Sequence, residues 1–264
     1  MRRVGLVSFL RSVGRSLKLV WAFVVAGTEL LVKRPATREA RAEWLHQFCA
    51  RSLKSFGIEV EVVGRYPDRG AVISNHTGYL DIVVFAALHR CVFVSKAEIA
   101  KWPVLGWMTT MSGTVYVHRG RGGSAVQAST GMQAATEAGL PVVFFPEGTT
   151  TNGEAMLPFR SGMLAQVLGA GLPVTAAYVR YELGEGNDPD VRVSDDVAYW
   201  GDVTLARHIF KFLSLRNVKV KVRFADAPIQ FSSDLLHRKE AAVEARTAVQ
   251  ELAVQSGVPE VLAY

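Results

Sequence analysis

A histidine and an aspartate that could share a proton-transfer task stand in the stretch NHTGYLD, residues 75–81. His76 follows a short apolar run, and Asp81 falls in the first turn of a segment with helical character. Helical side chains tilt toward the N-terminus of their helix, so the Asp81 carboxylate could point back at the imidazole. A carboxylate there would fix the ring tautomer and raise its basicity, which suits removal of a proton from a hydroxyl. The spacing alone is also compatible with a loop histidine beside a helix-capping aspartate.

Polar and basic residues follow the ends of other apolar runs. VVFFP is followed by Glu147, Gly148 and Thr149, where an acid, hydroxyl groups and a flexible backbone could grip a polar ligand. Arg119 ends the run GTVYVHR, and Arg160 lies in LPFRSG. The planar guanidinium of arginine can donate two hydrogen bonds to a phosphate group. Taken singly, each segment is equally well read as a polar turn or a solvated arginine.

Taken together, these blocks resemble the glycerolipid and lysophospholipid acyltransferase family. The signatures of that family are Asn-His, four residues and Asp, followed later by Phe-Pro-Glu-Gly-Thr. NHTGYLD and FPEGTT match them in the same order, and GTVYVHR lies between them where the family has a strand ending in arginine. LPFRSG and GLPVTAAYV resemble two further blocks, so the similarity covers roughly residues 70–180.

The resemblance implies an enzyme, an O-acyltransferase of the 1-acylglycerol-3-phosphate O-acyltransferase type, with His76 and Asp81 as the catalytic pair. It implies transfer of a fatty acyl group from acyl-CoA or acyl carrier protein to a hydroxyl of a lysophospholipid. The first acceptor to consider is 1-acyl-sn-glycerol-3-phosphate, in phospholipid biosynthesis. No cofactor is expected beyond the acyl donor, and no cluster of metal ligands is visible in the sequence, so we expect no metal.

The resemblance also implies which residues hold the acceptor: Arg119, Glu147, Gly148 and Thr149 at its glycerol-phosphate part, and Arg160 at the phosphate. One departure from the family pattern concerns the acceptor. Many glycerol-phosphate enzymes have arginine after Glu-Gly-Thr, whereas Thr150 stands here. Lyso-ornithine lipid or another lysophospholipid is therefore an alternative acceptor. A non-catalytic, membrane lipid-binding protein is the alternative from another functional class.

The secondary-structure elements that carry these residues can be predicted from the sequence, in which strand and helix patterns alternate. Alternating elements of this kind predict an α/β fold with a mixed, mainly parallel central sheet covered by helices. Residues 184–196 have the composition of a loop. We expect strands at 58–64, 71–74, 91–95, 113–119, 141–146, 173–181 and 218–225. We expect helices at 79–88, 104–111, 124–138, 162–171 and 203–213, and in the tail that begins at 233.

The N-terminal segment predicts association with a membrane. Residues 1–41 hold nine of the 30 basic residues and only two of the 24 acidic ones. Arg11, Arg15 and Lys18 recur at helical spacing among bulky aliphatic residues, which favours an interfacial helix over a nucleic-acid-binding arm. A single membrane span is the main alternative, although the apolar run from Leu19 to Val32 is short for one.

These features predict two parts: membrane-associating helices in 1–57, and an acyltransferase α/β domain in 58–264. The chain of 264 residues with 49% hydrophobic residues can bury a substantial core. Cys49 and Cys91 show neither metal-site nor disulfide-framework spacing, so we expect buried thiols in a reducing compartment. The expected location is the cytoplasmic face of a membrane, with a membrane lipid and the acyl donor as partners and no nucleic acid.

Overall fold

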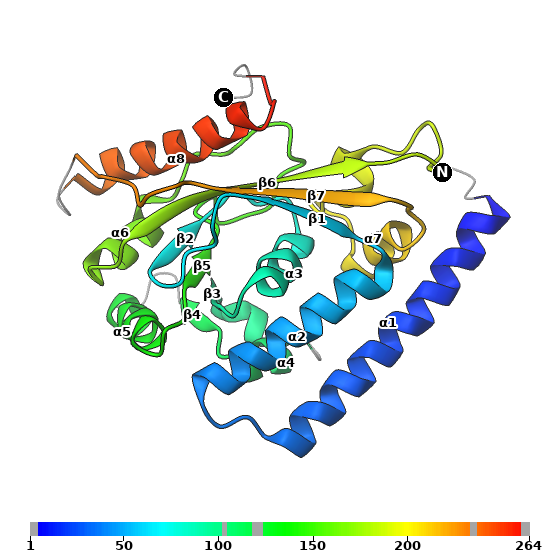
Figure 1. Ribbon diagram of the computed structural model, residues 1–264, viewed down its shortest axis with the longest axis horizontal. Helices are drawn as coiled ribbons and strands as arrows, with labels where there is room; N and C mark the ends of the chain where they lie inside the picture. Colours follow the sequence, from blue (N-terminus) through cyan, green and yellow to red (C-terminus); the bar gives the residue numbers. More distant parts are fainter. Residues whose placement is uncertain (1–4, 102–104, 118–123, 233–236, 260–264) are drawn as a thin grey trace.

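A mixed sheet of seven strands forms the centre of the molecule (Figure 1). The computed structural model describes residues 5–101, 105–117, 124–232 and 237–259. The strand order is β1-β7-β6-β2-β5-β3-β4, and every neighbouring pair is parallel except β6 and β7. This confirms the predicted fold class. The strands are β1 Glu59–Val63, β2 Ala71–Ile73, β3 Val92–Lys96, β4 Val115–Val117, β5 Val142–Phe144, β6 Val174–Leu183 and β7 Val218–Phe224.

Helices cover both faces of this sheet (Figure 1). They are α1 Leu6–Lys33, α2 Arg38–Phe56, α3 Tyr79–Leu88, α4 Leu105–Met111, α5 Ser124–Glu137, α6 Ser161–Gly169, α7 Leu205–Phe212 and α8 Arg238–Gln255. A 3-10 turn, η1, spans Ala97–Lys101, and a π-helical turn, η2, spans Val193–Val197. The segment predicted as loop at 184–196 therefore ends in a helical turn that the sequence analysis did not anticipate.

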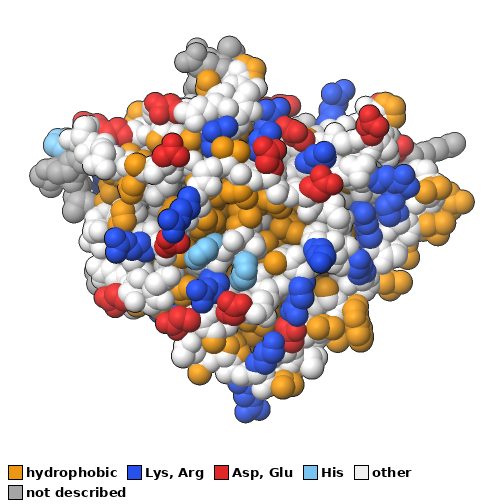
Figure 2. All heavy atoms as spheres, viewed as in Figure 1, with side chains coloured by type: hydrophobic (Ala, Val, Ile, Leu, Met, Phe, Trp, Pro, Cys, Tyr) orange, Lys and Arg blue, Asp and Glu red, His pale blue; other side chains and the backbone are white. Residues whose placement is uncertain are grey.

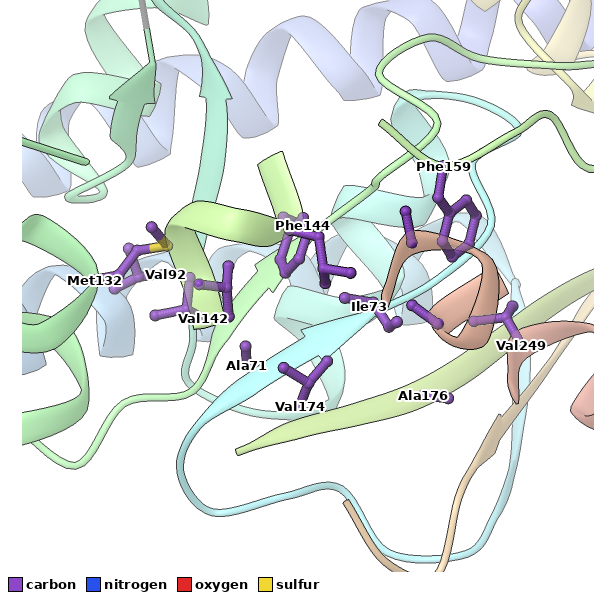
Figure 3. Close-up of a cluster of buried hydrophobic side chains, with 14 of the residues drawn as sticks. Ala71, Ile73, Val92, Met132, Val142, Phe144, Phe159, Val174, Ala176 and Val249 are labelled. Carbon is purple, nitrogen blue, oxygen red and sulfur yellow. The ribbon is translucent and has the colours of Figure 1, made fainter. Parts of the chain in front are cut away.

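Two hydrophobic cores lie on the two faces of the sheet. Alternate strand side chains supply them: Ala71 and Ile73 of β2 belong to one core, and Val72 belongs to the other. The first core lies beneath α5, α6 and α8 (Figure 3), and the second lies beneath α2, α3 and α7. Cys49 and Cys91 are both free and buried in the second core, as predicted.

The register of the sheet brings two loop segments to one edge. β2 and β5 run parallel as neighbours, and Ile73 pairs with Phe144. His76 and Glu147 each lie three residues beyond this pair, so they leave the sheet at the same level. The carboxyl ends of parallel strands are where such folds collect functional groups. Short strands and their register therefore explain why segments 71 residues apart in the chain meet.

α1 turns Arg11 and Arg15 toward the rest of the protein and most of its large apolar side chains outward. Arg11 donates to the carbonyl of Ser214 at 2.6 Å, and Arg15 donates to that of Leu215 at 2.5 Å, just beyond the end of α7. The outward face carries exposed large apolar residues, and Figure 2 shows orange side chains along the edge of the molecule that α1 forms. Those more than half exposed are Leu6, Val7, Leu10, Leu17, Val20, Trp21, Val24, Leu31 and Val32.

This arrangement corrects one detail of the sequence analysis. A basic polar face was expected to lie beside the apolar one, but the arginines donate hydrogen bonds to backbone carbonyl groups of the protein itself. Among the described helices, none combines the length and apolar character needed to cross a bilayer. A salt bridge of 2.8 Å between Glu29 and Arg51 also ties the end of α1 to α2.

Candidate active site

His76 and Asp81 meet at the edge of the sheet where β2 ends. Nδ1 of His76 lies 2.7 Å from Oδ2 of Asp81. His76 sits in the connection after β2, while Asp81 occupies the first turn of α3. The negative charge of Asp81 is therefore near the positive end of the helix dipole. The short strand-turn-helix connection thus produces the contact that the five-residue spacing predicted.

The hydrogen bonds of Asp81 define the tautomer of His76. An ionised carboxylate only accepts hydrogen bonds, so the Nδ1–H of the imidazole is the donor in this pair. Nε2 is then unprotonated and can accept a proton. Among the residues that the structure describes, none is hydrogen-bonded to Nε2. The ring also stacks on Phe145, with centroids 4.0 Å apart and planes 8° apart, which fixes the direction of Nε2.

Glu147 braces the backbone around His76. Its Oε1 accepts from the amide of His76 at 2.7 Å, and its Oε2 accepts from the amide of Leu157 at 2.8 Å. The residue is 2% exposed. A further bond runs from the amide of Thr151 to the carbonyl of His76 at 2.9 Å. Glu147 therefore joins two loops at the edge of the sheet, and direct contact of its carboxylate with a substrate stays a prediction.

The other predicted binding residues lie around this brace. Arg160 is exposed, and its Nε donates to the carbonyl of Glu147 at 3.1 Å, which places the guanidinium beside the site. Gly148 adopts a φ of 69°, a conformation that glycine enters without strain, and Thr149 next to it is exposed. Arg119 lies outside the described residues. Five of the six described candidates, all but Asp81, are thus drawn from loops at the edge where β2 and β5 end.

Three comparisons with known proteins bear on this site. A family model described as acyltransferase matches residues 58–180. The lyso-ornithine lipid O-acyltransferase of Rhodobacter capsulatus is 36% identical over 80% of this chain and 74% of its own length. The chain belongs to the acyltransferase family. It is an O-acyltransferase with a mainly parallel α/β fold, as the sequence analysis predicted.

Other relatives of this acyltransferase carry two kinds of name. The 1-acyl-sn-glycerol-3-phosphate acyltransferase of Neisseria gonorrhoeae is 31% identical over 64% of both chains. A crystal structure of PlsC from Thermotoga maritima, a 1-acyl-sn-glycerophosphate acyltransferase, has a TM-score of 0.59 to this chain. That likeness covers 92% of this chain and 98% of the other at 21% identity, and it shows the shared fold.

Burial sets the electrostatics of the acyltransferase site. Removal from water raises the pKa of Glu147 to about 7, because an ionised carboxylate loses hydration there. The amides of Leu157 and His76 act in the opposite direction, since they donate to the charged form, and the nearby charge of Asp81 raises the pKa further. Burial also lowers the pKa of His208, whose Nδ1 lies 3.1 Å from the hydroxyl of Tyr79. His208 therefore favours the neutral form beside Tyr79.

Sequence reasoning missed three residues of the acyltransferase site. Phe145 supplies the stacking surface for His76, Asn75 holds β6 beside the loop that carries His76, and Tyr181 binds the carboxylate of Asp81. The position of Phe145 next to Pro146 and Glu147 was a usable signal, because Phe145 directly follows β5, the strand that leads into the site. Tyr181 offered none, because it lies 100 residues from Asp81.

Proposed function

We propose that this acyltransferase moves a fatty acyl group from a thioester donor to the hydroxyl of a lysolipid of the lyso-ornithine class. The observation that carries the chemistry is the pairing of His76 with Asp81, which leaves Nε2 free to take a proton. Two observations support the acceptor class. Relatives named lyso-ornithine lipid O-acyltransferase are 36% and 32% identical to this chain. Thr150 also stands where many glycerol-phosphate enzymes have arginine.

The proposed reaction needs one base and two bound substrates. His76 removes the proton from the acceptor hydroxyl, and the oxygen attacks the carbonyl carbon of the thioester. The tetrahedral intermediate collapses, the carbon–sulfur bond breaks, and the proton passes from the imidazolium to the departing thiolate. Asp81 stabilises the imidazolium throughout. No acyl-enzyme is required, because holding both substrates together supplies much of the rate. Acyl-CoA and acyl carrier protein are the proposed donors, with no other cofactor and no metal.

A second acceptor, 1-acyl-sn-glycerol-3-phosphate, is favoured by a specific feature of the site. The guanidinium of Arg160 is exposed beside the Glu147 turn, where it could bind a phosphate. Arg119 would supply a second cationic contact if it has the role that the family resemblance implies. These residues support binding of a phosphate-bearing acceptor.

The outward face of α1 supports a position at a bilayer. Trp21 and Leu17 are each 68% exposed, and their neighbours on this face are also apolar. An exposed apolar surface of this extent marks an interaction site. We propose that the face lies in the cytoplasmic leaflet, where it holds the site near acceptor and product. Within the N-terminal part, 1–57, α1 would then serve as the anchor, while α2 packs on the sheet of the catalytic part, 58–264.

Release of free thiol is the measurement that tests the function. The full chain in detergent or vesicles would be given acyl-CoA or acyl carrier protein with a panel of lysolipids. We expect His76→Ala to lower turnover on the order of 10²–10⁴-fold, as for loss of a general base. His89→Ala is the matched control, since it removes an imidazole from the other end of α3. Activity of His76→Ala within a few-fold of wild type would remove His76 as the base.

The panel also separates the two acceptors and the alternative class. Thiol release with lyso-ornithine lipid and none with 1-acyl-sn-glycerol-3-phosphate is the expected result. The reverse pattern would establish the phosphate-bearing acceptor instead. Lipid binding without thiol release from any combination would point to a non-catalytic lipid-binding protein and contradict the enzyme.

A further inference from the structure

Tyr181 reaches the catalytic pair from a strand far along the chain. Its hydroxyl donates to Oδ1 of Asp81 at 2.6 Å, a short contact for an O–H···O bond. Tyr181 belongs to β6, and both its side chain and the Asp81 carboxylate lie inside the protein. The hydroxyl touches the oxygen of Asp81 that does not face His76. Tyr181 can therefore act on the imidazole only through the carboxylate.

Five donors converge on the two oxygens of Asp81. Oδ2 accepts from Nδ1 of His76 and from the amides of Thr77 and Gly78, at 2.7, 2.7 and 3.0 Å. Oδ1 accepts from the hydroxyl groups of Thr77 and Tyr181, at 3.0 and 2.6 Å. A buried carboxylate is stable only when such donors replace its lost hydration. The two hydroxyls therefore stabilise the charge and hold the plane of the carboxylate so that Oδ2 faces the imidazole.

Strand β6 is held in place for this contact. The side chain of Asn75 bonds both the amide and the carbonyl of Val179, each at 2.9 Å. Val179 lies two residues before Tyr181, so the side chains of Val179 and Tyr181 point to the same face of the strand, toward α3. Asn75 directly precedes His76 in the chain. The loop that carries the imidazole and the strand that carries the tyrosine are thus joined by two hydrogen bonds.

The tyrosine hydroxyl is kept in the form that the contact requires. Burial and the adjacent charge of Asp81 raise the pKa of Tyr181 well above its ordinary value. The hydroxyl therefore keeps its proton at neutral pH and remains a donor. A donor of this kind to a charged acceptor contributes more than a neutral hydrogen bond, roughly 1.5–3 kcal/mol.

We propose that Tyr181 is a positioning residue for acyl transfer, which aligns the Asp81 carboxylate with His76 through its hydroxyl. The inference rests on the proposed role of His76 as the base. Unlike His76, Tyr181 contacts neither the substrate nor the nitrogen that takes the proton, because its hydroxyl is bonded to Oδ1 of Asp81. Its removal should slow the chemical step and leave binding of the acceptor unchanged.

Tyr181→Phe tests the inference, with Tyr66→Phe as the matched control. Tyr66 is buried in the same core, and its hydroxyl finds no nitrogen or oxygen partner there. We expect Tyr181→Phe to lower kcat roughly 10- to 100-fold, the equivalent of a lost charged hydrogen bond, with acceptor KM within about threefold. Tyr66→Phe should stay near wild type. Unchanged kcat in a folded Tyr181→Phe protein would overturn the inference.

Nitrogen-15 spectra of the imidazole give a readout that a purely structural role would not move. The signal of His76 is assigned by its absence in His76→Ala. We expect wild type to show the Nδ1–H tautomer and Tyr181→Phe to show a mixture of tautomers. A pure Nδ1–H tautomer in the variant would contradict the inference. If Tyr181→Phe fails to fold, Thr77→Val removes the other donor to Oδ1 and is read in the same way.

The same experiments separate failure of this inference from failure of the proposed function. If His76→Ala keeps its activity, the base is not His76, whatever the tyrosine does to the tautomer. If His76→Ala is inactive while Tyr181→Phe matches wild type in rate and tautomer, the base stands and only the role of Tyr181 falls.

Discussion

α1 and the His76–Asp81 site both reverse the usual division between an apolar interior and a polar surface. On α1, apolar side chains such as Leu17 face outward, while Arg11 and Arg15 face the protein. At the site, carboxylates lie inside. The difference is in how each reversal is compensated. Asp81 and Glu147 obtain their hydrogen-bond donors from the chain itself, whereas the outward face of α1 has no covering element in the described structure.

This difference shows that folding supplies the hydrogen-bond donors of the buried carboxylates, whereas cover for the apolar face of α1 has to come from a partner. A buried charge without donors would destabilise the fold by several kcal/mol, so its donors have to be part of the fold. Exposed apolar surface is compatible with a folded chain, but its contact with water is unfavourable. Burial of that surface in a bilayer would remove the unfavourable contact. The chain itself therefore supplies the donors to both buried carboxylates, while α1 is consistent with the proposed membrane contact.

The largest expected effect comes from two leucines of α1 that face opposite ways. Leu30 is 1% exposed and packs with Trp44 and Met108, whereas Leu17 is 68% exposed. Leu30→Ala should lower the free energy of unfolding by about 2–5 kcal/mol. Leu17→Ala should change it by less than about 0.5 kcal/mol, yet lower binding to phospholipid vesicles roughly tenfold. Urea unfolding and vesicle sedimentation measure the two quantities. Equal vesicle binding by Leu17→Ala and wild type would contradict the proposed membrane contact of the outward face of α1.

A second effect concerns the buried carboxyl group of Glu147. Its pKa is raised to about 7 from an ordinary value of 4.5, so between these pH values the folded state binds a proton that the unfolded state does not. The free energy of unfolding should therefore fall as the pH rises through this window, by up to about 3 kcal/mol. Glu147→Gln cannot titrate, so its stability should fall less between pH 5 and pH 8. Parallel urea-unfolding profiles for the two proteins would refute the titration of Glu147.

The smallest effect is expected at the junction of α1 and α7. Arg15→Gln removes a charged donor from carbonyls at the C-terminal end of α7, where a positive charge is favourable. The loss of unfolding free energy should be about 1 kcal/mol or less, because the arginine is partly solvated. Arg69→Gln, at an exposed position outside the helices and strands, is the matched control and should show almost none. Equal losses in the two variants would show that the Arg15 contacts do not stabilise the protein.

Much of the site was predictable because its first contacts are local. The His76–Asp81 pair follows from a strand, a short turn and the first turn of a helix. The five-residue spacing is therefore enough to predict that the two side chains meet. The alternation of strands and helices likewise predicted a mainly parallel sheet, which collects loop residues at one edge. What could not be predicted is the direction of the Glu147 side chain, which turns inward and accepts from the amides of His76 and Leu157.

By itself, the sequence of this acyltransferase determined its reaction class, the contact between His76 and Asp81 and the order of its elements. Those features depend on residue types at short spacing and on the backbone preferences of single segments. Tertiary structure alone decided that Tyr181 completes the Asp81 network, that Glu147 braces two loops, and that α1 turns its arginines inward. Each of these depends on strand order, register and helix rotation, which are set by packing between segments far apart in the chain.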